Sequence, residues 1–281
     1  MQYLIIGAGP AGVNAAETLR KLDEEADIRI LGDEPEPPYS RMAIPYLLMG
    51  NIEEQGTHLR DRADHFAVLN IEVTQARVQR VDPAAHQVVL ESGDAIAYDK
   101  LLIATGSSPA RPPLPGIEGD NVSTCWTLAD ARAIQARVPT GSRVVLIGAG
   151  FIGSIILEAL GMRGVQLVVI EQGERMVPRM MGPNAAELLK RWCESKGVTV
   201  YTGVGVSAVE PNGVLLQDGT HIGADLVITA TGVRPNIDFL GGSGIEVDQG
   251  VLIDRQFRTN VTDIHAAGDV AQGLDFCTGQ Y

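Results

Sequence analysis

The sequence contains little cysteine. Only three of its 281 residues are cysteines, Cys125, Cys193 and Cys277, and their spacing forms neither a C-x-x-C nor a C-x-x-x-x-C pair. A dithiol redox centre needs two thiols held close together, and such short spacings are its usual sequence signature. The sequence therefore predicts no dithiol relay, and we expect each cysteine to be a small buried apolar residue.

Basic residues are also scarce. Lysine and arginine number 22 against 35 acidic residues, which leaves a net charge of −13. Such a charge opposes binding to nucleic acid and to anionic membranes. The five histidines show no ligand-like spacing, and so we expect no metal site.

Long uninterrupted apolar runs are missing. The stretch over residues 144–162 is mostly apolar, but Ser154, Glu158 and several glycines interrupt it, which favours a strand, a turn and a helix over a membrane span. No basic leader with an apolar core precedes the first expected strand, which starts within three residues of Met1. We therefore expect a cytoplasmic protein.

The sequence contains two glycine-rich fingerprints. Residues 7–12 read GAGPAG after an apolar run over 3–6, and residues 148–153 read GAGFIG after an apolar run over 144–147. Each pattern is typical of a strand, a tight turn and a helix that bind a dinucleotide. The first glycine makes the turn, the second lets the backbone approach a pyrophosphate, and the third lets the helix pack on the strand. We therefore predict two dinucleotide sites, with the candidate residues Gly7, Gly9, Pro10, Ala11, Gly12, Gly148, Gly150, Phe151, Ile152 and Gly153.

Acidic residues follow each fingerprint at the distance expected of a ribose-binding carboxylate. Asp33 and Glu34 follow a predicted strand over 27–31, and Glu171 follows one over 166–170. A carboxylate at the end of this strand, about 20 residues after the fingerprint, accepts hydrogen bonds from a ribose. Glu171 would also repel the 2′-phosphate of NADPH, which favours NADH, although Arg175 lies close enough to complicate this discrimination.

The chain repeats more than its fingerprints. Two matching segments, over 98–106 and over 224–232, each follow a hairpin-like stretch and end in Ala-Thr-Gly. A strand that ends in small residues lets a nucleotide or a neighbouring domain approach closely. The sequence therefore predicts an α/β fold with two similar units, each a βαβ motif, an antiparallel meander and a buried strand. The candidate binding residues in these segments are Ala104, Thr105, Gly106 and Gly232.

A third motif near the end of the chain contains Gly268 and Asp269. With the two fingerprints and the paired Ala-Thr-Gly segments, the sequence resembles the FAD-dependent pyridine nucleotide-disulfide oxidoreductase superfamily over essentially its whole length. The resemblance implies two Rossmann-like, three-layer ββα domains, with the NAD domain inserted in the FAD domain. It also implies that Asp269 binds the ribityl chain of FAD and that a helix begins after it. The implied domains are 1–112 and 241–281 for FAD and 113–240 for NAD(H).

Met42 narrows the resemblance to one branch. It stands where the NADH oxidases, NADH peroxidases and coenzyme A disulfide reductases carry a single redox cysteine, and a thioether cannot form a thiolate. The segment over 32–41 instead resembles the branch of the NADH:rubredoxin and ferredoxin reductases and the flavin domain of nitrite reductase. The FAD-binding residues that this branch implies are Asp33 and Glu34 at the adenosine ribose, Arg41 at the phosphates, and also Val78 and Arg111.

Two positions depart from this branch. Tyr46 and Ile155 stand where many members place a lysine near flavin N5 and a glutamate that pairs with it. The lysine and the glutamate are absent together, as expected of an ion pair, because either charge buried alone would be costly. The sequence therefore assigns no catalytic residue near N5.

These features together predict an FAD-dependent NADH oxidoreductase. The expected reaction is hydride transfer from NADH to the flavin, with electrons passed to an external acceptor. That acceptor is expected to be an iron–sulfur or rubredoxin-like protein, or a metal centre of a larger complex. An NADH oxidase or a small-disulfide reductase is the alternative enzyme, and an NADH-responsive regulatory flavoprotein is the alternative outside catalysis.

The end of the sequence carries one more expectation. Members of the superfamily normally continue after the Gly-Asp motif into an interface domain, whereas this sequence stops about a dozen residues past Asp269. We therefore expect that C-terminal domain to be absent and the sequence to be a truncated part of a protein that can form a homodimer.

Overall fold

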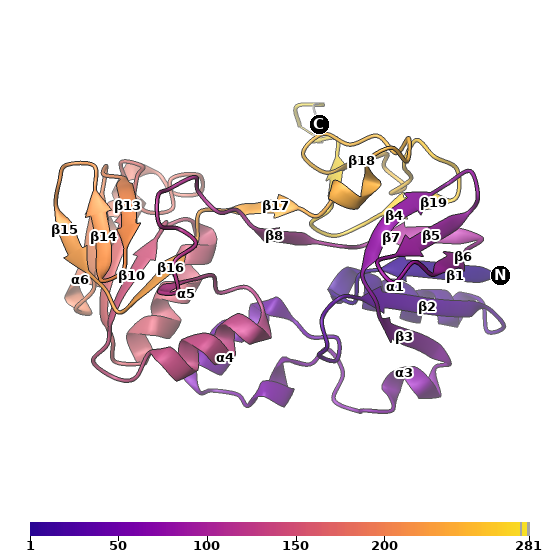
Figure 1. The fold of residues 1–281 in the computed structure, drawn as a ribbon, viewed down its shortest axis with the longest axis horizontal. Coiled ribbons are helices and arrows are strands. Elements are labelled where there is room, and N and C mark those ends of the chain that lie inside the picture. The colour runs from indigo at the N-terminus through magenta and orange to yellow at the C-terminus, as the bar shows by residue number, and fades with distance from the viewer. Residues whose placement is uncertain (276, 280–281) are drawn as a thin grey trace. The chain divides into compact units, whose positions relative to one another are not determined.

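The chain folds into two compact units, each built on a parallel sheet (Figure 1). The structure is a computed structural model that describes residues 1–275 and 277–279. Phe276, Gln280 and Tyr281 of the expected segment 241–281 lie outside the described residues. Unit 1 comprises Met1–Ser40, His58–Ser108 and Arg234–Tyr281, and unit 2 comprises Arg41–Thr57 and Pro109–Val233.

Unit 1 is organised around a parallel sheet with the strand order β19-β7-β1-β2-β3. Helix α1 (Pro10–Leu22) joins β1 to β2, and the short helix α3 (His65–Val68) lies beside β3 (Figure 1). The strand, turn and helix predicted at the first fingerprint are therefore confirmed. The strands are β1 (Gln2–Ile6), β2 (Asp27–Gly32), β3 (Ile71–Gln75), β7 (Lys100–Ile103) and β19 (Ile264–Ala266).

Side chains of β1 are buried on both faces of this sheet. Ile5 packs with Val13 and Ala16 of α1 on one face, whereas Leu4 and Ile6 belong to the core on the other face. A strand buried on both faces is apolar throughout, as the run over 3–6 is. The second face is covered by an antiparallel meander, and so unit 1 has the predicted three layers. The meander strands are β4 (Val78–Asp82), β5 (Gln87–Leu90) and β6 (Ala95–Ala97).

Smaller elements complete unit 1 and its borders. β18 and β20 pair in parallel. β8 pairs with β17 in a two-stranded sheet, and the chain passes from one unit to the other within each of these two strands. The bounds are β8 (Ser107–Pro109), β17 (Val233–Pro235), the 3-10 helix η3 (Asp238–Leu240), β18 (Val251–Ile253) and β20 (Ala271–Gly273).

Unit 2 repeats the plan of unit 1. Its parallel sheet has the strand order β12-β11-β10-β16-β9, and a second antiparallel meander, β13-β14-β15, packs on it through a shared apolar core (Figure 1). None of the helices in the described part of the chain is long and apolar enough to cross a membrane. The strands are β9 (Val122–Ser123), β10 (Arg143–Ile147), β11 (Gln166–Glu171), β12 (Thr199–Thr202), β13 (Val206–Glu210), β14 (Gly213–Leu216), β15 (His221–Gly223) and β16 (Leu226–Thr229). The helices are α4 (Leu128–Arg137), α5 (Phe151–Met162) and α6 (Pro183–Ser195).

The segment Arg41–Thr57 packs with unit 2, although the expected boundaries place it in the FAD-binding part. It contains η1 (Arg41–Ala43), α2 (Ile44–Met49) and η2 (Glu54–Thr57). Helix α2 packs against α4 and α5, and its residues Ile44, Leu47 and Leu48 are buried. The assignment of FAD to one unit and of NAD(H) to the other stays a prediction.

Arg20 ties the end of α1 to the chain that follows α3. It is 9% exposed, and its guanidinium has five N–H donors, each of which has a backbone carbonyl as its acceptor. A buried cation is tolerated here because every donor is satisfied. The acceptors are the carbonyls of Asp23, Glu24, Ala26, Leu69 and Asn70, at 2.7–3.1 Å.

We predict that Arg20→Met lowers the free energy of unfolding by about 3 kcal/mol, because five partly buried carbonyls lose a charged donor at once. Urea unfolding followed by circular dichroism measures the change. Lys21→Met removes an exposed charge from the same turn of α1 and serves as the matched control. Equal destabilisation by the two variants would contradict the role given to Arg20.

Candidate functional site

The first glycine of each fingerprint lies against the end of a neighbouring strand. Gly7 has a φ of +120° and Gly148 a φ of +102°, a region of backbone space that favours glycine. A Cβ on Gly7 would lie 2.0 Å from the carbonyl oxygen of Ala104, and one on Gly148 would lie 2.5 Å from that of Ala230. Both distances are far inside van der Waals contact. The chain's own packing therefore requires glycine at both positions.

The third glycine of each fingerprint is also required by the chain itself. A Cβ on Gly12 would lie 2.0 Å from the carbonyl oxygen of Gly7, and one on Gly153 would lie 2.1 Å from that of Gly148. This close approach lets the helix start directly against the turn. Close packing within their own unit thus explains why four of the six fingerprint positions are glycine.

Packing within the chain does not explain the second glycine of each fingerprint. Gly9 and Gly150 have φ values of −78° and −73°, in an extended conformation that any residue adopts. Among the described residues, and apart from its local chain neighbours, nothing lies within 4 Å of a Cβ built on either glycine. Neither backbone conformation nor crowding within the chain explains these two glycines. A pyrophosphate that approaches the bare backbone does explain them.

The helices that follow the fingerprints begin without a side-chain cap. Pro10 opens α1 and Phe151 opens α5, and neither helix has an acidic residue in its first turn. Helix α4 differs, because Thr127 and Asp130 form a capping box at its start. The N–H groups and the positive end of the dipole at the start of α1 and α5 are therefore suited to a phosphate.

The third sequence motif lies beside the first fingerprint in unit 1. A Cβ on Gly268 would lie 3.1 Å from the Cβ of Ala11, and the N–H of Ala267 donates to the carbonyl of Ile103 at the end of β7. The Oγ of Ser107 donates to the Asp269 carboxylate at 2.9 Å. Unit 1 thus gathers the predicted FAD-binding glycines and Asp269 at the carboxyl edge of its parallel strands.

The helix expected after Asp269 is not found in the described residues. Asp269 lies in a turn, and β20 follows it, paired in parallel with β18. Val270 is fully buried and leads the chain back into the core of unit 1. The expectation of a helix dipole at this point was therefore wrong.

The two Ala-Thr-Gly segments end in matching hydrogen bonds. The hydroxyl of Thr105 donates to the carbonyl of Asn236 at 2.9 Å, and that of Thr231 donates to the carbonyl of Ala110 at 2.8 Å. Asn236 also donates through its side-chain amide to the carbonyl of Thr105 at 2.8 Å. Sequence reasoning missed Asn236. The internal repeat could have indicated it, since it lies four residues after Gly232, as Ala110 lies four after Gly106.

The carboxylates expected at the two riboses have different surroundings. In unit 1, Asp33 is exposed directly after β2, and Glu34 accepts the hydroxyl of Tyr39 at 2.5 Å. In unit 2, the Glu171 carboxylate accepts the N–H of Ala149, inside the second fingerprint, at 2.8 Å. Glu171 is therefore held against the fingerprint turn, where a ribose-binding carboxylate is needed.

Three other predicted FAD-binding residues lie outside these clusters. Arg41 donates to the carbonyl of Trp126 at 3.0 Å and lies over its ring, with 5.7 Å to the ring centroid. Arg111 pairs with Glu118, and both arginines belong to unit 2. Val78 is half-buried at the start of β4. The roles of these three residues at FAD stay predictions.

The cysteines differ from each other in burial. Cys125 and Cys193 are buried as expected. Burial, together with the nearby Asp130 carboxylate, raises the pKa of Cys125 to about 12, and burial also raises the pKa of Cys193. The expectation was wrong for Cys277, which is exposed in a turn whose N–H groups bond the Asp275 carboxylate. Neither buried thiol is suited to form a thiolate near neutral pH.

Met42 and Tyr46 are both exposed near the start of unit 2. Met42 is 61% exposed on η1, and Tyr46 is exposed on α2. Ile155 lies on α5, against which α2 packs. The structure thus brings together the two elements where related enzymes place a lysine and a glutamate, but it supplies no charged pair there.

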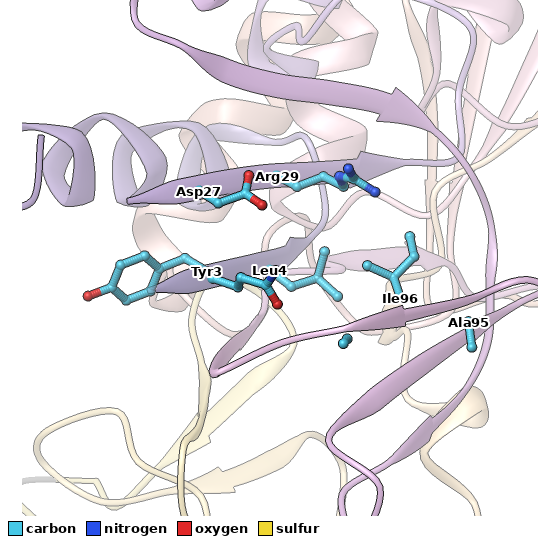
Figure 2. A pocket seen from close by; sticks show the side chains of 8 residues that line it. Tyr3, Leu4, Asp27, Arg29, Ala95 and Ile96 are labelled. Carbon is cyan, nitrogen blue, oxygen red and sulfur yellow. The ribbon is translucent and has the colours of Figure 1, made fainter. Parts of the chain in front are cut away.

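A pocket of about 250 Å³ lies at the opposite edge of the unit 1 sheet (Figure 2). Asp27 and Arg29 line it from β2, and Ile96 lines it from β6. Asp27 begins β2, and Gln2, which also lines the pocket, begins β1, whereas the fingerprint follows the carboxyl end of β1. The pocket is therefore separate from the predicted dinucleotide site.

Comparison with known proteins agrees with this geometry. The family model described as pyridine nucleotide-disulphide oxidoreductase matches residues 1–279. The chain belongs to this family. The oxidoreductase class, the Rossmann-like fold and the cofactors FAD and NAD(H) that the sequence predicted are confirmed by this membership.

Relatives within the pyridine nucleotide-disulphide oxidoreductase family match nearly the whole chain. The NADH-dependent phenylglyoxylate dehydrogenase subunit epsilon of Aromatoleum evansii is 32% identical, over 99% of this chain and 67% of its own length. The rubredoxin-NAD(+) reductase of Pseudomonas putida is 31% identical, over 96% of this chain and 72% of its own length. The chain thus spans about two thirds of the length of such relatives.

A solved structure shows the same architecture. The reductase in the crystal structure of a covalent putidaredoxin reductase–putidaredoxin complex superposes with a TM-score of 0.93 at 29% identity. The match covers 98% of this chain and 69% of that one. The fold of this oxidoreductase is therefore that of known reductases.

We predict that Gly9→Ala folds normally but loses most of its bound FAD. The added Cβ meets no atom of the chain, yet it occupies the space that a pyrophosphate needs. Thermal unfolding and the flavin absorbance of the purified protein measure the two effects. Gly7→Ala is the matched comparison, because its Cβ would clash with Ala104 and destabilise the fold itself. A Gly9→Ala variant that keeps its FAD would contradict the site.

Proposed function

We propose that this chain is the part of an FAD-dependent NADH oxidoreductase that binds both cofactors. The observation that carries the proposal is the open space at Gly9 and at Gly150, each at the start of a helix without a side-chain cap. FAD, when bound, supplies an acceptor for the hydride of NADH and a donor of electrons to a further acceptor. The chain's own groups bind, orient and separate these molecules.

Each unit is suited to one dinucleotide. In unit 1, the N–H groups at the start of α1 would bind the pyrophosphate, Asp33 and Glu34 would bind the ribose, and Asp269, which accepts from Ser107, would bind the ribityl chain. In unit 2, α5 and Glu171 play the matching parts for NADH. The assignment of FAD to unit 1 is supported by the third motif, because Gly268 lies against Ala11 of the first fingerprint.

Met42, Cys125 and Cys193 would offer no thiol relay to a bound flavin. Met42 cannot form a thiolate, and Cys125 and Cys193 are buried with raised pKa values. The acceptor is therefore an outside group, either an iron–sulfur or rubredoxin-like protein or a metal centre of a larger complex. One relative is named as a rubredoxin reductase, which supports the first acceptor, and another is named as a subunit of a dehydrogenase, which supports a place in a larger complex. A homodimer of the full-length protein and a cytoplasmic location are further parts of this proposal, carried by the family resemblance.

Anaerobic titration with NADH tests the proposal directly. We expect the visible flavin absorbance to bleach at about one equivalent of NADH, since one hydride carries the two electrons that a flavin accepts. Oxidised rubredoxin, oxidised ferredoxin and dissolved oxygen are then added in turn. Rapid return of the absorbance with a redox protein supports the proposed acceptor, and return with oxygen alone supports an oxidase. A yellow protein that NADH does not bleach would overturn the proposal.

We predict that Glu171→Ala raises the KM for NADH about tenfold, the factor that corresponds to losing a charged hydrogen-bond acceptor. The KM for NADPH should rise less, because the same change removes a repulsive carboxylate. Steady-state kinetics with both substrates measures the ratio. Glu174→Ala, an exposed carboxylate in the same loop, serves as the matched control. An unchanged preference in the Glu171 variant would refute its ribose role.

A further inference from the structure

Val177 has a backbone conformation that its side chain disfavours. It lies in the loop over 172–182 between β11 and α6, and its φ is +48°. The left-handed region is unfavourable for a β-branched residue, and the proline that follows at 178 restricts it further. Val177 is nevertheless 5% exposed and well packed. Strain of this kind persists only where the surrounding structure holds it in place.

Backbone hydrogen bonds hold Val177 on both sides. Its N–H donates to the carbonyl of Ala149 at 2.8 Å, which ties the loop to the second fingerprint. Its carbonyl accepts the N–H groups of Met180 and Met181, both at 3.0 Å. The strained residue is therefore the point at which the loop turns back after touching the fingerprint.

Arg175 braces the same turn from within the loop. Its Nε donates to the carbonyl of Met181 at 3.1 Å, and its Nη2 donates to the carbonyl of Pro178 at 3.2 Å. These bonds link the two ends of the turn that starts at Val177. Two N–H donors of the guanidinium are thus engaged with carbonyls of its own loop.

The far side of Ala149 is held by Glu171. The Ala149 N–H donates to Oε2 of Glu171 at 2.8 Å, and the Gly173 N–H donates to Oε1 at 2.7 Å. Both carboxylate oxygens are therefore fixed by backbone donors from different segments. Ala149, which lies between the first two glycines of the second fingerprint, thus accepts the N–H of Val177 through its carbonyl and donates its own N–H to Glu171. We call Ala149, Glu171, Arg175 and Val177 the clasp.

We propose that Val177 and Arg175 are positioning residues for the nicotinamide dinucleotide, and that the clasp makes the site selective for NADH over NADPH. Arg175 holds Val177 in its left-handed conformation, Val177 holds Ala149, and Ala149 holds the Glu171 carboxylate in the orientation that meets the ribose hydroxyls. This inference rests on the proposed NADH site in unit 2. The 2′-phosphate of NADPH would be repelled by the fixed Glu171 carboxylate, and Arg175, which bonds its own loop, would not offset this repulsion.

A double-mutant cycle tests the link between Arg175 and the strain at Val177. Glycine adopts a φ of +48° without penalty and keeps the N–H that bonds Ala149, and so Val177→Gly should bind nearly as wild type. Arg175→Met should weaken binding of NAD⁺ about tenfold, the factor expected when the hydrogen bonds that hold the turn are lost. In the Val177→Gly background, the same Arg175→Met change should weaken binding only about twofold, because no strain remains to be restrained.

The readout is calorimetric binding of NAD⁺, and separately of NADP⁺, to the FAD-loaded protein. Arg175→Met should narrow the ratio of the NAD⁺ affinity to the NADP⁺ affinity. A purely structural role for Arg175 would lower thermal stability without changing this ratio. Arg179→Met, an exposed arginine of the same loop, is the matched control, and Arg175→Lys replaces Arg175→Met if the latter does not fold.

The outcomes separate this inference from the proposed function. If the wild-type protein binds NAD⁺ and the losses of the two single variants add in the double variant, the clasp is refuted while the NADH site stands. An Arg175→Met variant that binds NAD⁺ with wild-type affinity would also refute the clasp while the NADH site stands. A wild-type protein that does not bind NAD⁺ overturns the proposed function and the clasp together.

Discussion

Two close approaches between backbone atoms determine the rest of this structure. In each unit, the first fingerprint glycine lies so near the carbonyl that ends a neighbouring strand that no side chain fits between them, at Gly7 with Ala104 and at Gly148 with Ala230. This contact aligns the turn with the carboxyl edge of the sheet and directs the start of the next helix along that edge. The free N–H groups at the start of the helix and the Ala-Thr-Gly segment are thereby placed side by side.

The two units share one plan but differ in how each holds the carboxylate that is expected at a ribose. Their sheets, meanders and fingerprint turns match, and so the difference lies in the loop that follows the second strand of each. In unit 1, Glu34 is held by the hydroxyl of Tyr39, a side chain of its own loop. In unit 2, Glu171 is held by the backbone of the fingerprint itself. A carboxylate fixed to the turn suits a substrate that must be recognised at each turnover, whereas a tightly held cofactor needs no such discrimination.

The placement of sulfur separates this chain from enzymes that store electrons in thiols. The thioether of Met42 is exposed on η1, and the thiols of Cys125 and Cys193 are buried, where ionisation is disfavoured. Neither Met42 nor the two buried cysteines are therefore suited to store electrons from a flavin in a thiol. The identity of the electron acceptor is therefore the central functional question.

The sequence by itself determined the repeated α/β plan, both fingerprints and the carboxylates that follow them, because glycine spacing and apolar alternation act over a few neighbouring residues. It did not determine the strand after Asp269, the burial of each cysteine or the packing of Arg41–Thr57 with unit 2. Nor did it reveal the carbonyl cluster of Arg20 or the bonds of Asn236. Those features depend on partners 49 and 131 positions away, which only the folded chain brings into contact.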